Sequence, residues 1–118
     1  MPRAADKSTI YKVLRAPEWQ SARAAGRFSG SSDDRRDGFI HFSTAEQLPG
    51  TLERHFAGER DLELLAVPAR ALGDALRWET SRGGALFPHL YGDLDLTHIA
   101  WRASLPMGSA GPLPERLA

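Results

Sequence analysis

The segment DGFIHFSTAEQ, residues 37–47, places a histidine inside a short apolar run and follows it with two hydroxyl residues. The run FIHF predicts a short strand, in which the side chains of His41 and its two neighbours point to opposite faces. Two interpretations remain open. The strand ends in a helix cap and nothing more, or it delivers the imidazole of His41 and the hydroxyls of Ser43 and Thr44 to a pocket.

The residues after this strand predict how the next helix begins. Ser43 and Glu46 match a capping box, in which the hydroxyl accepts from the third helical amide while the carboxylate reaches back. Pro49 favours a second helical start, because proline fits the first turn of a helix. Three apolar residues spaced four apart would form the buried face of this helix: Leu48, Leu52 and Phe56.

Outward from this segment, the hydrophobic pattern predicts four longer strands and one more helix. The helix is expected over residues 17–26, with a proline in its first turn and a glycine as its stop. The polar stretch 26–38 is expected to be a loop. The second half of 81–92 is expected to be irregular or an edge because of Pro88. Strands are expected at residues 9–14, 62–67, 75–79 and 97–105.

These elements predict an α+β fold: a single compact domain with a split mixed or antiparallel β-sheet and two or three short helices. The length of 118 residues suits one domain. We place that domain at residues 9–106. Residues 1–8 and 107–118 are expected to be loosely ordered tails, because both are dominated by small, polar or turn-forming residues.

Composition excludes several classes of protein and of chemistry. Fifteen basic residues balance fifteen acidic ones, which argues against a general electrostatic grip on nucleic acid or an anionic membrane. The absence of cysteine removes disulfides, thiolate nucleophiles and cysteine-ligated metals. No apolar run approaches the roughly 20 residues of a membrane-spanning helix, and the first residues lack the apolar part of a secretory signal. We therefore expect a cytoplasmic protein.

A second segment, FPHLYG at 87–92, is also rich in functional side chains. His89 and Tyr91 would share one face of an extended chain. They could bind a ring or a sugar, or they could cover the end of the core with their polar tips in water. Glu79 and Arg82 are the remaining charged candidates, although a glutamate at a strand end is by default a solvated surface residue.

Sequence motifs that define common cofactor sites are absent. The chain has no phosphate-binding P-loop, dinucleotide fingerprint, zinc-protease motif or nucleophile elbow. A metal site made of His41, His89 and a carboxylate would lack any diagnostic ligand spacing. We therefore predict no resident metal and no tightly bound cofactor.

The two segments DGFIHFSTAEQ and LRWETSRGGALFPHLYG together resemble those of domain-of-unknown-function family 952, a family of small bacterial proteins. The resemblance extends from IYKV at 10–13 through Trp19 and LLAV at 64–67. Members of this family look like the ADP-ribosyltransferase fold, a compact split β-sheet that in active enzymes holds NAD or a related nucleotide in its cleft. A likeness of fold does not by itself imply the activity.

The resemblance implies roles for particular residues. In ADP-ribosyltransferases the first core strand offers a His or Arg to the ribose, and this position corresponds to Lys12, where many relatives have His. An ammonium keeps a hydrogen-bond donor but cannot accept. The second strand offers hydroxyls beside the nicotinamide, which corresponds to Ser43 and Thr44 with His41 next to them. A later glutamate that supports transfer corresponds to Glu79.

Two classes of function follow from the resemblance. The first is an enzyme for NAD-dependent ADP-ribosyl transfer or a related nucleotide-processing step, with NAD as substrate and His41 and Glu79 as catalytic residues. The second is a non-catalytic module that binds a small nucleotide-like or anionic ligand. RNA-end processing, a further activity of this fold, is disfavoured by the balanced charge. The ligand-binding residues would be Lys12, Ser43, Thr44, Arg82, His89 and Tyr91.

Overall fold

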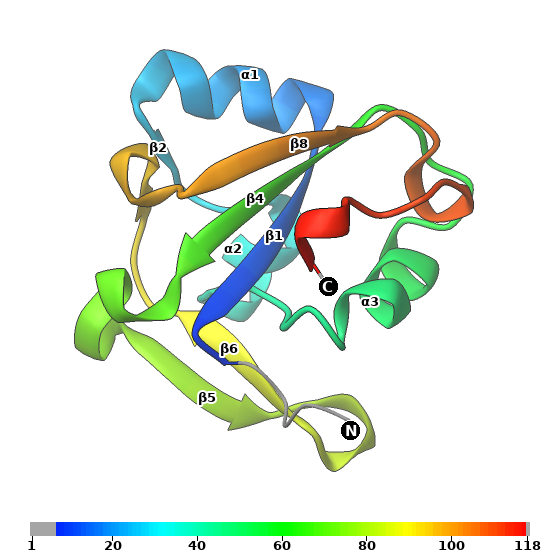
Figure 1. Ribbon diagram of the computed structural model, residues 1–118. Coiled ribbons are helices and arrows are strands. Elements are labelled where there is room, and N and C mark those ends of the chain that lie inside the picture. Colours follow the sequence, from blue (N-terminus) through cyan, green and yellow to red (C-terminus); the bar gives the residue numbers. More distant parts are fainter. Residues whose placement is uncertain (1–6, 118) are drawn as a thin grey trace.

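The computed structural model describes residues 7–117, except for the side chain of Arg82 (Figure 1). It confirms a compact single-domain α+β fold, and every strand pair within the described residues is antiparallel. No helix in this part of the chain is long and apolar enough to cross a membrane. The helices are α1 (Ala16–Ala25), α2 (Ser32–Asp37) and α3 (Leu48–His55).

The described strands form three small sheets, with the strand orders β1-β4-β8, β3-β6-β5 and β2-β7. The predicted strands at 9–14, 62–67 and 75–79 are confirmed as β1, β4 and β5 to within one residue at each end. The bounds are β1 Thr9–Arg15, β2 Arg27–Phe28, β3 Ile40–His41, β4 Leu62–Pro68, β5 Leu76–Thr80, β6 Leu86–Leu90, β7 Leu94–Asp95 and β8 Trp101–Leu105.

The alternation of side chains along β1 builds two separate cores. Ile10 and Leu14 point to one face of the β1-β4-β8 sheet and pack with Ala22 of α1. Tyr11 and Val13 point to the other face, where they join the apolar residues of α3. The sheet therefore lies between α1 and α3, and Leu48, Leu52 and Phe56 form the buried face of α3 as predicted.

The stretch 26–38, expected to be a loop, contains the helix α2. Ser31 and Asp34 cap it reciprocally: the backbone N–H of Asp34 donates to Ser31 Oγ at 3.2 Å, and that of Ser31 donates to Asp34 Oδ2 at 2.9 Å. Gly38, with φ of 88°, ends it. Polar caps rather than an apolar face define this short helix, so hydrophobic periodicity did not predict it.

The reciprocal side-chain pair predicted after β3 lies one residue further along the chain and closes the turn that precedes α3. Thr44 and Gln47 make the reciprocal pair, since Gln47 N–H donates to Thr44 Oγ1 at 3.2 Å and Thr44 N–H donates to Gln47 Oε1 at 3.0 Å. Ser43 is instead within 2.7 Å of Thr51 Oγ1, and Glu46 is exposed. The side-chain amide of Gln47 accepts from a backbone N–H as the carboxylate of Glu46 was expected to do, so both pairs fit the same sequence pattern.

Strand β6 is the central strand of its sheet, so the prediction of an irregular or edge segment around Pro88 is wrong. The carbonyl of Pro88 accepts from the N–H of Phe42 at 2.9 Å. In an antiparallel ladder a residue directs its N–H and its C=O to the same neighbour, so the bond that Pro88 cannot donate would have gone to Phe42. The pairing with β5 therefore loses no hydrogen bond at Pro88, whereas regular pairing with β3 ends after His41.

The expected strand 97–105 is shorter than predicted, because its first residues form a 3-10 turn over Leu96–His98. The side chain of Asp95 accepts from the backbone N–H of Thr97 at 2.9 Å and thereby fixes this turn. The clean alternation that suggested a strand continues only from Trp101 onward.

Beyond residue 106 the chain packs against the domain through Leu113 and Leu117, which contact the core on the α3 side. Arg116 also lies over the ring of Trp101, at 4.6 Å from its centroid. The expectation of a loosely ordered tail did not anticipate these contacts, because two isolated leucines among glycines and prolines give no periodic signal.

Candidate functional site

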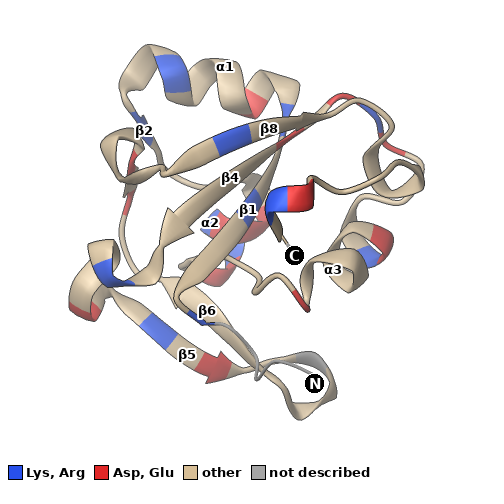
Figure 2. Ribbon diagram, in the orientation of Figure 1, with Lys and Arg blue, Asp and Glu red and all other residues tan. Residues whose placement is uncertain are grey.

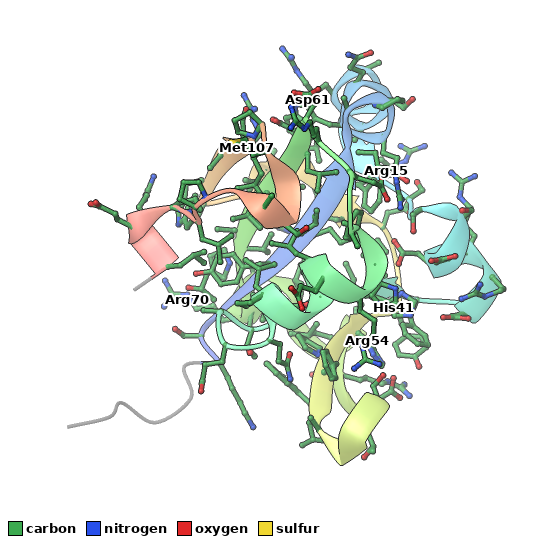
Figure 3. The ribbon with its side chains drawn as sticks, turned by 90° about the vertical axis from the view of Figure 1, so that its right-hand side faces the viewer. Arg15, His41, Arg54, Asp61, Arg70 and Met107 are labelled. Atoms are coloured by element: carbon green, nitrogen blue, oxygen red, sulfur yellow. The ribbon has the colours of Figure 1, made fainter. Side chains whose placement is uncertain are left out.

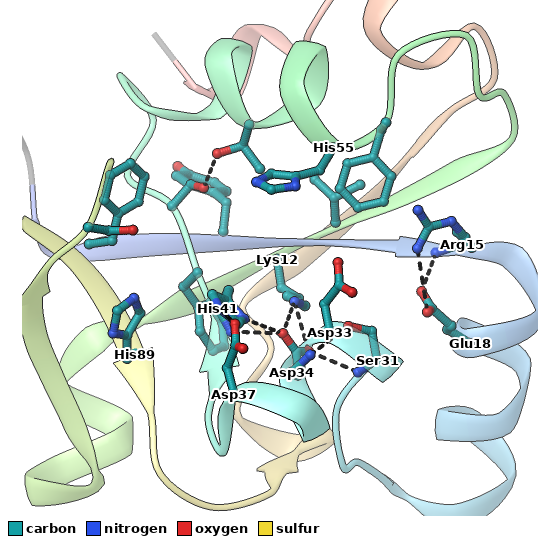
Figure 4. Close-up of a pocket in the computed structure, with 18 of the residues that line it drawn as sticks. Lys12, Arg15, Glu18, Ser31, Asp33, Asp34, Asp37, His41, His55 and His89 are labelled. Atoms are coloured by element: carbon teal, nitrogen blue, oxygen red, sulfur yellow. Dashed lines mark hydrogen bonds and ion pairs between the residues drawn. The ribbon is translucent and has the colours of Figure 1, made fainter. Parts of the chain in front are cut away.

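A pocket opens where strands β1 and β3 separate. One bridge joins β1 to the chain just after β3: Tyr11 and Ser43 exchange backbone hydrogen bonds of 2.8 and 2.9 Å. Past this bridge the strands diverge, so Lys12 and Val13 line one side of the gap and His41 the other. The cavity has a volume of about 270 Å³ (Figure 4). Figure 3 shows His41 between α2 and α3, close to the β5–β6 hairpin.

Lys12 and Asp34 form a buried ion pair across the floor of this gap. The ammonium Nζ lies 3.1 Å from Asp34 Oδ1 and 2.9 Å from Oδ2. The stem of Lys12 shares a sheet face with Ile10, and its ammonium lies 5.8 Å from the ring centroid of Phe28. Both charged side chains are at least nine-tenths buried, so each depends on the other for neutralisation.

Asp34 also holds His41 from two directions. Its Oδ1 lies 2.6 Å from His41 Nδ1 and accepts from the backbone N–H of His41 at 3.1 Å. The second ring nitrogen, Nε2, lies 2.9 Å from Oδ2 of Asp37, one helical turn further along α2. Both ring nitrogens of His41 therefore face carboxylate oxygens, which can only accept from them.

The network shifts the acid–base properties of its buried members. Burial alone would raise the pKa of Asp34, but hydrogen bonds from His41 and the charge of Lys12 outweigh it and hold this pKa far below its usual range. Burial lowers the pKa of Lys12, and the carboxylate of Asp34 offsets part of that change. Asp34 is consequently an ionised acceptor that fixes both partners.

On the neighbouring strand, His89 is held by a different carboxylate. Its Nδ1 lies 2.8 Å from Oε1 of Glu79, which also accepts from the hydroxyl of Tyr91 at 2.7 Å. The hydrogen bond from His89 is the main cause, and that from Tyr91 the second, of the lowered pKa of Glu79. Phe39 stacks on the imidazole of His89, with ring centroids 4.0 Å apart and an interplanar angle of 25°. His89 is the direct partner of His41 across β3 and β6, and the centroids of the two imidazole rings are 5.6 Å apart.

The charged residues of the lining are paired with one another. Among the described residues that line the pocket, the cations are Lys12, Arg15 and Arg36, and the acids are Glu18, Asp33, Asp34 and Asp37. Each cation has a carboxylate within ion-pair distance. Figure 2 shows the same mixture of signs around α2. With the histidines left out, the lining therefore carries one more acid than cation, and a phosphate would find no described cation without a partner.

The structure brings together some of the predicted site residues and separates others. Lys12, His41, Ser43 and His89 line the pocket, whereas Thr44, Glu79 and Tyr91 do not. Thr44 closes the turn before α3, and Glu79 and Tyr91 act on the pocket only through His89. The side chain of Arg82 lies outside the described part of the chain.

Sequence reasoning missed the residues of α2 altogether. Asp34 and Asp37 belong to the run SSDDRRD, which was interpreted as part of a polar loop. The pattern Ser31-x-x-Asp34 is itself a capping signal and could have placed a helix here. His55 and Thr51 also line the pocket from α3, although no motif marks them. Within the described residues, no group of three His, Asp or Glu side chains could hold a metal ion.

Residues 13–102 match the model of one protein family, described as a protein of unknown function (DUF952). The protein belongs to this family. Its fold is shared by protein CC0527 from Caulobacter crescentus, which has 50% sequence identity to this chain in its crystal structure. The TM-score is 0.79, and the match covers 81% of this chain and 84% of that one. The solution NMR structure of CC0527 is 49% identical, with a TM-score of 0.76 and coverage of 84% and 85%. No curated protein matches the chain.

Family membership confirms the first part of the resemblance inferred from the sequence. The two segments that suggested it, around His41 and His89, fall within the matched residues, and both contribute side chains to the lining of the same pocket.

Proposed function

We propose that the pocket binds the nicotinamide ribosyl part of NAD⁺ and that the protein cleaves its glycosidic bond, with transfer to an acceptor. One observation supports this above the others: two imidazoles, His41 and His89, are each held by a carboxylate and line a single pocket that four acidic side chains also line. Positioned imidazoles are suited to moving protons at neutral pH.

The charge of the lining suits the chemistry of this substrate. The nicotinamide ring of NAD⁺ is a cation, and the ribosyl centre gains positive charge as the ring departs. Carboxylates held in place before the reaction stabilise such a charge more strongly than water does. Glu79, which the resemblance implied would support transfer, does not line the pocket and would not supply this countercharge. Asp37 lines it beside His41 and would take that role.

The size of the cavity limits how much of the nucleotide it encloses. A volume of 270 Å³ lies just below the range of roughly 300–1,000 Å³ that is usual for ligand pockets. The enclosed part would take the nicotinamide and its ribose. The pyrophosphate and adenosine would lie toward the mouth, where Arg15 and Arg36 are partly exposed and could exchange their carboxylate partners for phosphate oxygens.

A second candidate is a non-catalytic binding module, and the buried network favours it. Lys12 and His41 are neutralised by Asp34 inside the fold, which is the arrangement of a structural network as much as of a catalytic one. Such a module would select a neutral or cationic ring rather than the anionic ligand that the sequence suggested.

Turnover and binding assays with nicotinamide nucleotides test the proposal. We expect NAD⁺ to raise the melting temperature more than NADH or ADP-ribose, because only NAD⁺ carries the cationic ring. Release of nicotinamide, measured by chromatography, distinguishes an enzyme from a non-catalytic binding module. The variant Glu53→Gln, in the groove between α3 and the C-terminal segment, serves as a control. Equal stabilisation by NADH and NAD⁺ would contradict the role of the acidic lining, and no effect of any of the three would refute the proposal.

A further inference from the structure

We infer that His89, and not His41, is the catalytic base of the pocket, with Glu79 as its positioning residue; this rests on the proposed function. The sequence had suggested the opposite assignment, with His41 catalytic and His89 a binding residue. The two imidazoles differ in the number of ring nitrogens that carboxylates occupy. That difference decides which of them can take up a proton from a ligand.

His41 has no ring nitrogen left for a substrate. Nδ1 lies 2.6 Å from Asp34 and Nε2 lies 2.9 Å from Asp37. A ligand could reach either nitrogen only by displacing a carboxylate, and Asp34 is buried and bound to Lys12. His41 therefore links α2 to β3 and orders the acidic side of the pocket.

His89 has one nitrogen engaged and one available. Nδ1 is bound by Glu79, and no described residue hydrogen-bonds Nε2. The only buried side-chain nitrogen or oxygen without a partner in the described residues is Nδ1 of His98, so Nε2 of His89 keeps contact with the space of the pocket that it lines. Figure 4 shows the ring of His89 extending from β6 toward the interior.

Glu79 fixes the tautomer that a base requires. A carboxylate only accepts, so the neutral ring of His89 carries its proton on Nδ1 and presents a lone pair at Nε2. Phe39, whose ring centroid is 4.0 Å away, restricts rotation of the imidazole, and Tyr91 donates to the same carboxylate oxygen, Oε1. This is the relationship of carboxylate, imidazole and reacting hydroxyl that general-base catalysis uses in hydrolases.

The step that His89 would catalyse is activation of the acceptor, either water or a hydroxyl group. The acceptor O–H gives its proton to Nε2 of His89 while its oxygen forms the bond to ribosyl C1′. The bond from C1′ to the ring nitrogen breaks, and its electron pair leaves with neutral nicotinamide. His89 then holds the proton that the acceptor lost, and no oxidant or reductant is needed.

Two measurements on the whole protein test this assignment. Long-range ¹H–¹⁵N NMR of the ligand-free protein at pH 8 should show neutral His89 with its proton on Nδ1, and Glu79→Gln should alter that state while Asp33→Asn does not. In the nicotinamide-release assay, His89→Gln should lower kcat by about 10²–10⁴-fold with KM changed only a few-fold, as expected for a general base. Tyr91→Phe, which leaves the bond between His89 and Glu79 in place, should have a smaller effect than Glu79→Gln.

The outcomes separate this inference from the proposed function. A proton on Nε2 of neutral His89, or an unchanged kcat in a folded His89→Gln variant of a protein that does release nicotinamide, overturns the assignment and leaves the proposed function standing. If His89→Gln does not fold, Glu79→Gln gives the same test, because an amide keeps the size of the side chain and removes its charge. A wild-type protein that neither binds nor cleaves NAD⁺ overturns both.

Discussion

Nδ1 of His41 lies 2.6 Å from Oδ1 of Asp34, a residue seven positions earlier in the chain, and the same carboxylate holds the buried ammonium of Lys12. Asp34 thus ties together three segments: α2, the end of β3 and the middle of β1. The gap between β1 and β3 is spanned at its floor by an ionised side chain rather than by backbone hydrogen bonds.

Removal of the Asp34 carboxylate should therefore destabilise the whole domain. Asp34→Ala leaves the buried ammonium of Lys12 without its counterion, and we expect a loss of about 3–5 kcal/mol in the free energy of unfolding. Urea denaturation measures it. Asp33→Ala is the matched control, since Asp33 is exposed on the same helix and pairs only with Arg36 at the surface. Equal losses in the two variants would contradict a special role for Asp34.

The low pKa of Asp34 also predicts a particular dependence of stability on pH. A carboxyl whose pKa is depressed by folding stabilises the protein above its unfolded pKa, which is about 3.9, and this contribution is lost as pH falls toward the folded value. The wild type should lose stability below about pH 5, and Asp34→Asn should lose less over the same interval. If the free energy of unfolding falls equally in the wild type and in Asp34→Asn between pH 5 and pH 3, this prediction is wrong.

The shifted pair of Thr44 and Gln47 gives a test at the start of the α3 region. Thr44→Ala removes the hydroxyl that accepts from the N–H of Gln47 and should cost about 0.5–2 kcal/mol. Glu46→Ala should change the unfolding free energy by less than about 0.5 kcal/mol, because Glu46 is exposed. Chemical denaturation distinguishes the two variants. A larger cost for Glu46→Ala would restore the register that the sequence suggested.

Gly108 tests whether the segment after β8 is packed as described. A Cβ at this position would lie 1.9 Å from the carbonyl oxygen of Glu59, the residue whose carboxylate binds Arg15 at the mouth of the pocket. Gly26 is the control: its φ of 79° is also positive, but a Cβ there meets nothing within 4 Å. Gly26→Ala should cost about 1–2 kcal/mol from backbone strain alone. Gly108→Ala should cost clearly more, and equal costs in thermal denaturation would contradict the close approach.

Much of the fold could be predicted because its signals are local. The apolar runs of β1 and β4 and the spacing of Leu48, Leu52 and Phe56 report burial directly, and the structure confirms them. The helix α2 could not be predicted from periodicity, because polar caps and ion pairs define it. Pro88 misled the assignment of β6, since the direction of its missing hydrogen bond is set by tertiary pairing that no local pattern encodes.

The candidate site was predictable in part because two of its residues also give a local signal. His41 and His89 stand out because they interrupt apolar segments, and the structure places them on paired strands. Neither Asp34 nor Glu79 was assigned to its imidazole from the sequence, although Glu79 was named as a candidate catalytic residue. Asp34 comes from a stretch interpreted as a loop, and Glu79 reaches His89 only through the pairing of β5 with β6. Long-range pairing therefore determined the part that sequence reasoning missed.

The most direct test of the central claim is an NMR titration that locates the binding site of NAD⁺. A relative 49% identical has been solved by this method, so amide and imidazole signals can be followed residue by residue. We predict that NAD⁺ shifts the signals of Lys12, His41, Ser43 and His89, and that NADH shifts them less at the same concentration. Unchanged signals at these four residues, or shifts confined to the groove beside Ser109 and Leu113, would contradict the account.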